Sequence, residues 1–377
     1  MSKTVYLLGA GVNRGLANTK GLKPPLDGDF FQLLADQGEA LPGEAIPKGP
    51  TLPHYRLRHG GAVPPLELAS DAGNIYWVYD FIQRFWHRSP EDLAKEPLSL
   101  EELLTFLQLK QKDAQKSKND SEAAKEYLFC ELILEHRLLT YLSGFSDIAK
   151  ANQDMARFGR AIYKERSTVI TTNYDTIVET VIEQASNDNP KDGVRAWNAR
   201  DSYRFRFKEP ETRNRALGHV RPLVLKLHGS LNWGTLLIDA TTNRPKIEKS
   251  LAFYDRPFRN YLDLGLSSSS AGNWLYKPLI VPLILYKDVY YGHPAIKAAW
   301  NNAQKELSEC ERLVVIGYSF PPTDFHIKKL LLDVLFKRDL KELFIVNPDT
   351  SVVERIKDIT HFQKPVVVCK DIREFLE

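Results

Sequence analysis

Three short segments, far apart in the chain, carry residues that could do hydrogen-bonding and acid–base chemistry. They are Thr171-Thr172-Asn173-Tyr174-Asp175, Leu227-His228-Gly229-Ser230 and Gly317-Tyr318-Ser319-Phe320-Pro321-Pro322. Each segment follows a run of apolar, largely β-branched residues, which predicts a buried strand that ends where the polar residues begin. In an open α/β sheet, ligands bind in the crevice outside the carboxyl ends of the strands. We therefore expect the three segments to share one site.

A fourth segment, Gly9-Ala10-Gly11-Val12-Asn13, follows the first apolar run of the chain. Backbone amides at glycine can approach a pyrophosphate that a Cβ atom would obstruct. The glycine spacing is GxGxxxG rather than GxGxxG, and no acidic residue follows at the usual ribose position. A tight strand-to-helix turn therefore explains the glycines as well as a phosphate site does.

In the Thr171 segment, Thr172 and Asp175 have the spacing of a helix capping box, with Asp in place of the usual Glu. That interpretation explains the threonine and the aspartate without any ligand. It leaves Asn173 and Tyr174 unexplained, and we expect these two side chains to line the crevice at the end of the strand.

His228 comes directly after a predicted strand and is followed by a glycine, which allows a sharp turn. A lone histidine is usually structural or on the surface. This one lies where α/β enzymes place catalytic groups, and a near-neutral pKa suits a general base. The position therefore favours a catalytic role for His228.

The segment that begins at Gly317 has an ordinary structural explanation in part, because its prolines fix a turn and Thr323 or Asp324 can cap the following helix. Gly317 and Ser319 remain, and they could offer an amide and a hydroxyl to phosphate oxygens. Asn347 follows a later strand and could bond ribose hydroxyls or form an Asx-turn before Pro348.

The strands that must position these residues are predicted from apolar runs, and helical patterns fill several of the gaps between them. The runs cover residues 4–8, 168–170, 223–227, 279–285, 313–316, 343–346 and 365–369. This alternation predicts an α/β fold with a doubly wound, Rossmann-like parallel sheet. We expect a single domain whose sheet core is residues 1–16 and 167–377. A helical and loop-rich insertion, residues 17–166, interrupts it after the first strand, and residues 111–121 are expected to form a mobile loop there.

The bulk composition excludes several classes of protein. Hydrophobic residues make up 43% and charged residues 26% of 377 residues, which is typical of a globular protein. A net charge of +3 gives no argument for direct nucleic-acid or membrane binding, and no apolar run is long enough to span a bilayer. The three cysteines form no CxxC, so neither a disulfide framework nor a thiolate zinc site is expected. A cytoplasmic location is the default expectation.

Taken together, the loops resemble the sirtuin-like family of NAD-consuming enzymes. In that family a first strand ends in GAG and a small polar residue, and later strands end in T-x-N-x-D, in His-Gly, in Gly-x-Ser and before an Asn. This chain has the same order, and the matching residues are Gly9, Ala10, Gly11, Asn13, Thr171, Asn173, Asp175, His228, Gly229, Gly317, Ser319 and Asn347. The resemblance covers the sheet core and not the insertion.

The resemblance implies a role for each matched residue. Asn173 would hold the nicotinamide ribose and position a water, Asp175 would bond the carboxamide, and His228 would be the general base. The glycine loop with Gly317 and Ser319 would contact the phosphates. The remaining dinucleotide contacts would come from Thr171, Tyr174, Asn347, Lys370 and Asp371, with the last two beside the adenine.

Two features depart from the protein-deacetylating sirtuins. Those enzymes carry four zinc-binding cysteines after the His loop, whereas this chain has none between Cys130 and Cys310. The long insertion also replaces a shorter cofactor-binding loop. Both features resemble the divergent bacterial branch that hydrolyses NAD itself as an effector of antiphage defence by abortive infection. We expect no metal at the site.

The expected function is therefore an NAD glycohydrolase that releases nicotinamide and ADP-ribose or its cyclic form. Alternatives are an NAD-dependent protein deacylase or ADP-ribosyltransferase, and a non-catalytic sensor of NAD or ADP-ribose. The resemblance also implies a homo-oligomer, or a partner that senses infection, such as a helicase-like ATPase.

Overall fold

The computed structural model describes residues 3–17, 21, 23–34, 75–116, 121–188, 196–207, 221–239, 244–245, 251–253, 274–285, 287–321, 324–335 and 340–377. Its strands are β1 (Thr4–Leu8), β2 (Thr168–Thr171), β3 (Leu223–Lys226), β4 (Gly229–Asp239), β5 (Arg244–Pro245), β6 (Ala252–Phe253), β7 (Trp274–Ile280), β8 (Arg312–Ile316), β9 (Glu342–Val346) and β10 (Val367–Cys369). The helices up to the second strand are η1 (Ala10–Gly15), η2 (Asp27–Asp29), α1 (Phe30–Leu34), α4 (Ile75–Trp86), α5 (Pro90–Lys95), α6 (Leu100–Lys116), α7 (Ser121–Ser143), α8 (Phe145–Ala151) and α9 (Gln153–Glu165). The later helices are α10 (Ile177–Asp188), α11 (Ala199–Ser202), α12 (Asp288–Tyr291), α13 (Pro294–Ser308), α14 (Phe325–Leu335), α15 (Ser351–Thr360) and α16 (Ile372–Phe375).

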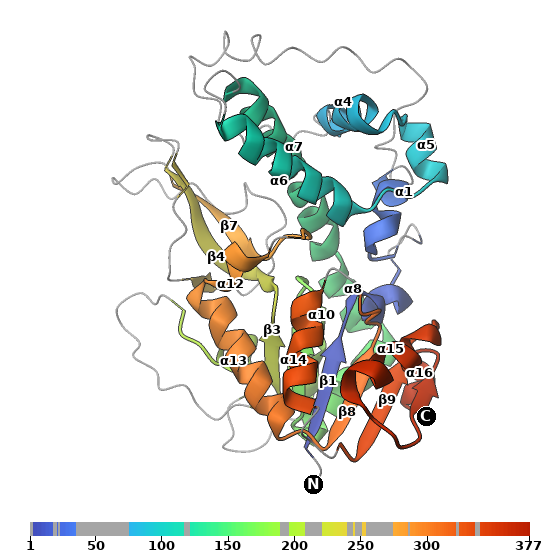
Figure 1. Ribbon diagram of the computed structural model, residues 1–377. Coiled ribbons are helices and arrows are strands. Elements are labelled where there is room, and N and C mark those ends of the chain that lie inside the picture. The colour runs from blue at the N-terminus through green and yellow to red at the C-terminus, as the bar shows by residue number, and fades with distance from the viewer. Residues whose placement is uncertain are drawn as a thin grey trace.

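Six parallel strands form the central sheet, in the order β10-β9-β8-β1-β2-β3. Counted along the sheet this is the doubly wound, Rossmann-like order, so the predicted α/β class is confirmed. The strands are short, and nearly all residues of β1, β2, β3 and β8 are buried, as expected for a sheet covered on both faces. The edge strand β10 is mostly exposed. The strand order reverses between β1 and β8, and the carboxyl ends of these two strands form the switch point of the fold (Figure 1).

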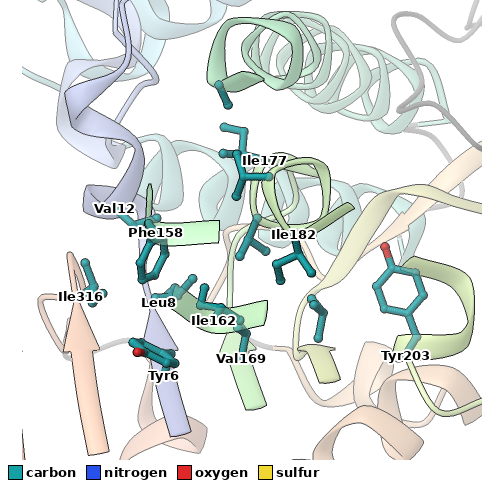
Figure 2. Packing of buried hydrophobic residues seen from close by; sticks show 14 of the residues in the cluster. Tyr6, Leu8, Val12, Phe158, Ile162, Val169, Ile177, Ile182, Tyr203 and Ile316 are labelled. Carbon is teal, nitrogen blue, oxygen red and sulfur yellow. The ribbon is translucent and has the colours of Figure 1, made fainter. Parts of the chain in front are cut away.

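Alternate residues of the strands serve two different cores. On one face, Tyr6, Leu8 and Val169 pack with residues of α9 and α10 (Figure 2). Residues of α8 and α16 belong to the same core. On the other face, Leu7, Ile170 and neighbouring strand residues pack with α13, α14 and α15. The helices therefore lie on both sides of the sheet and leave its carboxyl edge to the loops.

The helical insertion lies beyond the carboxyl ends of the strands (Figure 1). Its own core comes from α1, α4, α5, α6 and α7, and it includes Tyr174 and Ile284 from loops, Leu231 from β4 and Ile280 from β7. The last two helices before the second strand, α8 and α9, contribute to the core of the sheet instead. The insertion thus packs on the part of this edge that includes Tyr174.

Two sequence expectations about local structure were wrong. Residues 279–285 were predicted as a strand of the parallel sheet, but the strand there is Trp274–Ile280, and it pairs antiparallel with β4 in a second sheet. An apolar run alone does not distinguish the two kinds of sheet. The polar residues 111–116 were expected in a loop and instead complete the last turns of α6, while residues 117–120 lie outside the described residues.

Candidate active site

Three glycines at the switch point allow two loops to touch. A Cβ atom on Gly11 would lie 2.8 Å from Cα of Gly317, and a Cβ atom on Gly9 would lie 2.7 Å from the carbonyl oxygen of Gly317. Gly317 itself has φ +60°, and a Cβ there would lie 2.1 Å from the amide nitrogen of Val12. These contacts are too close for any side chain, so the glycines are explained by loop packing.

The amides of this glycine loop are already in use. The N–H of Gly9 donates to Ile316 O at 3.0 Å, and the N–H of Gly11 donates to Gly317 O at 2.9 Å. The second bond ties the two loops together, while Ala10 between them is exposed. The loop therefore has a defined shape before any dinucleotide binds.

Four of the predicted residues line one pocket at the ends of β1 and β2. Its cavity volume is only about 10 Å³, which is room for about one water molecule. Its polar lining consists of Asn13, Thr171, Asn173 and Asp175, and its apolar lining comes from β1, η1, α9 and α10. Apolar walls with a few convergent polar groups are the composition of a small-molecule site, but a drug-sized ligand needs several hundred Å³, so this cavity is one small recess at the sheet edge.

The polar groups of this pocket hold one another in place. Asn13 Nδ2 donates to Asp175 Oδ2 at 2.8 Å, and the other carboxylate oxygen accepts the N–H of Ile177 at 3.0 Å. Asp175 thus caps α10 two residues before its first turn, which replaces the predicted capping box with Thr172. Burial raises the pKa of Asp175, while the nearby charge of Lys226 acts in the opposite direction.

Asn173 is fixed by the neighbouring strands. Its Nδ2 donates to the carbonyl of Gly9 at 3.1 Å, and its N–H donates to Thr171 Oγ1 at 3.1 Å. The Thr171 hydroxyl donates in turn to Leu8 O at 3.1 Å. The side-chain oxygen of Asn173 is therefore held at the end of the sheet by two loops that the sequence separates widely.

Behind this pocket lies a buried polar network that sequence reasoning missed. Lys226, at the end of β3, donates to the carbonyl of Asp175 and pairs with Glu179 at 3.1 Å. Tyr203 donates to Glu179 Oε1 at 3.0 Å, and Asn232 Nδ2 donates to the Tyr203 hydroxyl at 3.1 Å. A lysine inside the apolar run LVLKL was the signal that could have revealed it.

His228 lies after the adjacent strand β3, in a second polar group. The turn expected there is confirmed, because Gly229 has φ +84° and a Cβ on it would lie 2.0 Å from Leu279 O. His228 Nε2 lies 3.4 Å from the Tyr291 hydroxyl and 4.0 Å from Asp324 Oδ1. Among the described residues, His228 is not part of the lining of the pocket around Asn173.

Two further charged residues complete the group around His228. Lys287, buried in front of α12, donates to Asp324 Oδ1 at 2.6 Å, and Tyr318 donates to Asp324 Oδ2 at 2.7 Å. These bonds, with the charge of His228, hold the pKa of the Asp324 carboxyl below its usual value although burial opposes them. The sequence patterns did not indicate Lys287, and they indicated Asp324 only as a helix cap.

The pKa of His228 differs from the sequence expectation. Burial, aided by Lys287 and His326, lowers it to about 4 despite the opposing charge of Asp324. The prediction of a near-neutral pKa for His228 was therefore wrong. The imidazole is neutral at pH 7 and keeps a lone pair that can accept a proton.

The remaining predicted residues lie elsewhere. Tyr174 is buried against the insertion, and its hydroxyl donates to Val281 O at 2.5 Å. Ser319 is exposed, and its carbonyl accepts a bond from Arg355 at 2.8 Å. Neither side chain lines the Asn173 pocket in the part of the chain that the structure describes.

Asn347, Lys370 and Asp371 lie together at the far end of the same edge. The N–H of Asn347 donates to Cys369 O at 2.9 Å, and its Oδ1 accepts the N–H of Asp349 in an Asx-turn. Asp371 caps α16 through the N–H of Glu374 at 3.1 Å. These bonds explain Asn347 and Asp371 structurally, and the adenosine contacts of all three residues stay predictions.

In the described ranges, no three or more His, Cys, Asp or Glu side chains are grouped so that they could hold a metal ion. Likewise, none of the described helices combines the length and apolar character needed to cross a membrane.

Comparison with known proteins gives one finding about the whole arrangement. A family model described as a SIR2-like domain matches residues 167–361. The match contains Asn173, Asp175, His228, Gly317 and Asn347 and ends before Lys370. No curated protein matches the chain.

Proposed function

Because this chain belongs to the SIR2-like domain family, we propose that it is an NAD glycohydrolase. SIR2-like domains bind NAD, and membership indicates NAD-dependent enzymatic activity. The finer proposal is that water replaces nicotinamide at C1′ of its ribose. The products would be nicotinamide and ADP-ribose, or cyclic ADP-ribose when an atom of the substrate itself attacks C1′.

The observation that carries the proposal is the pocket at the ends of β1 and β2. It joins Asn13, Thr171, Asn173 and Asp175, and His228 follows the next strand of the same sheet edge. Nicotinamide leaves as a neutral molecule, so the reaction needs groups that hold the ribose and orient a water more than it needs an acid. Asn173, fixed at Gly9 O, and the neutral imidazole of His228 suit these two tasks.

His228 would act as the general base. A proton acceptor must be neutral before the reaction, and the low pKa of the buried imidazole meets that condition at pH 7. Positive charge develops on the ribose as the glycosidic bond breaks, and water then attacks C1′. When His228 takes the proton of that water it becomes an imidazolium, which the carboxylate of Asp324, 4.0 Å away, would stabilise. General-base assistance of this kind contributes roughly 10²–10⁴ in rate.

We also propose that the activity is gated, as an NAD-depleting effector in antiphage defence. What supports gating is that His228 is only 3% exposed and that the insertion packs over the loops around it. Opening would come from assembly into a homo-oligomer or from a partner that senses infection. The lack of cysteines between Cys130 and Cys310 supports the hydrolytic branch over the zinc-bearing deacylases.

The test is product analysis of NAD incubated with purified protein, with and without an acetylated peptide. N173A and H228A run beside wild type, and N301A, an exposed asparagine of α13, is the matched control. Nicotinamide and ADP-ribose released without peptide, lost in N173A and H228A but kept in N301A, would support the proposal. Release that depends on the peptide would show a deacylase or transferase, and binding without turnover would mean a sensor or a gated enzyme that awaits its partner. Neither turnover nor binding would overturn the proposal.

A further inference from the structure

One face of α6 contacts the residues around the start of α12, which also lie close to His228. Glu101 Oε1 lies 3.5 Å from Lys287 Nζ, and Thr105 Oγ1 accepts the N–H of Leu285 at 2.9 Å. One turn farther along, Gln108 Nε2 donates to the Tyr290 hydroxyl at 3.4 Å. Positions 101, 105 and 108 recur at helical spacing, so these contacts lie on a single face of α6. A helix of the insertion thus contacts Leu285, Lys287 and Tyr290.

Residues at the two ends of α12 contact the group around His228. The hydroxyl of Tyr291, the last residue of α12, lies 3.4 Å from His228 Nε2, and Lys287 Nζ donates to Asp324 Oδ1 at 2.6 Å. Among the described residues, Asp324 is the carboxylate paired with the imidazole, at 4.0 Å. Three charged side chains, Glu101, Lys287 and Asp324, therefore form a largely buried chain that ends beside the neutral imidazole of His228.

Burial makes this chain sensitive to small movements. The side chain of Lys287 is 2% exposed and that of Asp324 is 10% exposed, so water screens their charges poorly. The same carboxylate oxygen, Asp324 Oδ1, lies 2.6 Å from Lys287 Nζ and 4.0 Å from His228 Nε2. Lys287 Nζ also lies 3.5 Å from Glu101 Oε1, so a residue of the insertion is in contact with the cation that holds Asp324.

We propose that Asp324 is a positioning residue for His228, and that the insertion sets this position through Glu101 and Lys287. The inference deepens the regulation of the site and rests on the proposed function for its catalytic consequence. A displacement of α6, by assembly or by a partner, would be transmitted to the imidazole without any contact between α6 and the substrate.

The structural part is tested without turnover, by NMR of the Cε1–H of His228, assigned with H228Q. The charged and titratable groups that face the imidazole are Asp324, Lys287, His326 and Tyr291, with Tyr318 and Glu101 behind them. We expect D324N to lower the pKa of His228, K287M to raise it, and E101Q to shift it in the direction of D324N. Opposite shifts in D324N and K287M would not arise from a general loss of packing.

The matched controls are E102Q, an exposed neighbour on α6, and D333N, an exposed aspartate of α14. Both should leave the His228 signal and the NAD turnover at the wild-type level. In E101Q we expect kcat to fall at least tenfold with KM nearly unchanged, because the affected step follows binding. If D324N does not fold, E101Q and K287M still decide the question.

The inference is overturned if E101Q and K287M give the same His228 signal and titration as E102Q. If wild type cleaves no NAD under any condition while these variants do shift the His228 signal, the proposed function fails and the coupling stands. If NAD is cleaved but E101Q equals E102Q in both readouts, the function stands and the coupling fails.

Discussion

The Nζ atom of Lys226 lies 3.1 Å from Oε1 of Glu179, and the two side chains are 0% and 4% exposed. This ion pair joins the end of β3 to α10 behind the carbonyl of Asp175, to which Lys226 also donates. Removing a charge from water costs several kcal/mol, which only a well-placed partner offsets. The pair therefore stabilises the loop that carries Asn173, through the bond from Lys226 to the carbonyl of Asp175.

Replacing one member of this pair should destabilise the protein strongly. In K226M, Glu179 keeps a buried charge that has lost its cationic partner, and we expect a loss of about 3–5 kcal/mol in the free energy of unfolding. The double variant K226M/E179L should recover much of that loss. Urea unfolding at pH 7 measures both. K329M, which breaks an exposed pair with Asp333 in α14, should cost under about 0.5 kcal/mol, and a K226M no worse than K329M would contradict the account.

A second prediction concerns the contact between the two glycine loops. In G317A the new Cβ would meet the Val12 amide nitrogen at 2.1 Å in a backbone region that favours glycine. We expect a loss of about 1–3 kcal/mol and a fall of at least tenfold in NAD cleavage, as about 1.4 kcal/mol of lost substrate positioning would give. Gly15→Ala is the control, because nothing lies within 4 Å of a Cβ there. Equal behaviour of the two variants, in thermal unfolding and turnover, would show that the loops do not need this contact.

Much of the sheet could be predicted because each buried strand is a short apolar run that ends in a polar loop. That pattern located β1, β2, β3, β8 and β9 and the carboxyl edge that unites Asn13, Asn173 and Asp175. It could not assign residues 279–285, because an apolar run looks the same in a parallel and an antiparallel sheet. The polar end of α6 was missed because residues 111–116 are mostly polar, and the buried Ala114 alone gives no helical pattern.

The environment of His228 could not be predicted from local sequence. Its neighbours Lys287, Tyr291 and Asp324 come from segments 59 to 96 positions later in the chain. The low pKa follows from burial under these segments and the insertion, and burial is a property of the folded chain. The pair of Lys226 and Glu179 was missed for the same reason, since its partners lie on different elements.

Burial of His228 should make stability depend on pH. The unfolded chain binds this proton near pH 6.5 and the folded chain near 4, so between these values the unfolded state holds more protons. The contribution is fully present above pH 6.5 and is lost as pH falls toward 4, by about 2 kcal/mol at pH 5. H228Q should remove that part of the pH dependence in urea unfolding. H136Q should remove a similar part, because burial also lowers the pKa of His136 to about 4, and an unchanged profile in H228Q would show that His228 is not buried.

The hydrogen bond between Asn13 and Asp175 predicts that the stability of N13D falls as pH rises, which is opposite to the effect of His228. Asn13 Nδ2 donates to Asp175 Oδ2 at 2.8 Å inside the pocket. In N13D two buried carboxyls would face each other and share a proton, so a folded-state pKa rises well above the unfolded value near 4. The protein is then most stable at low pH and loses about 2–4 kcal/mol relative to wild type between pH 5 and 8. N13L, which only leaves an acceptor unpaired, should lose about 1–3 kcal/mol at either pH. Parallel pH profiles of N13D and N13L in urea unfolding would mean that Asp175 does not face residue 13, and the polar lining of the pocket would need another arrangement.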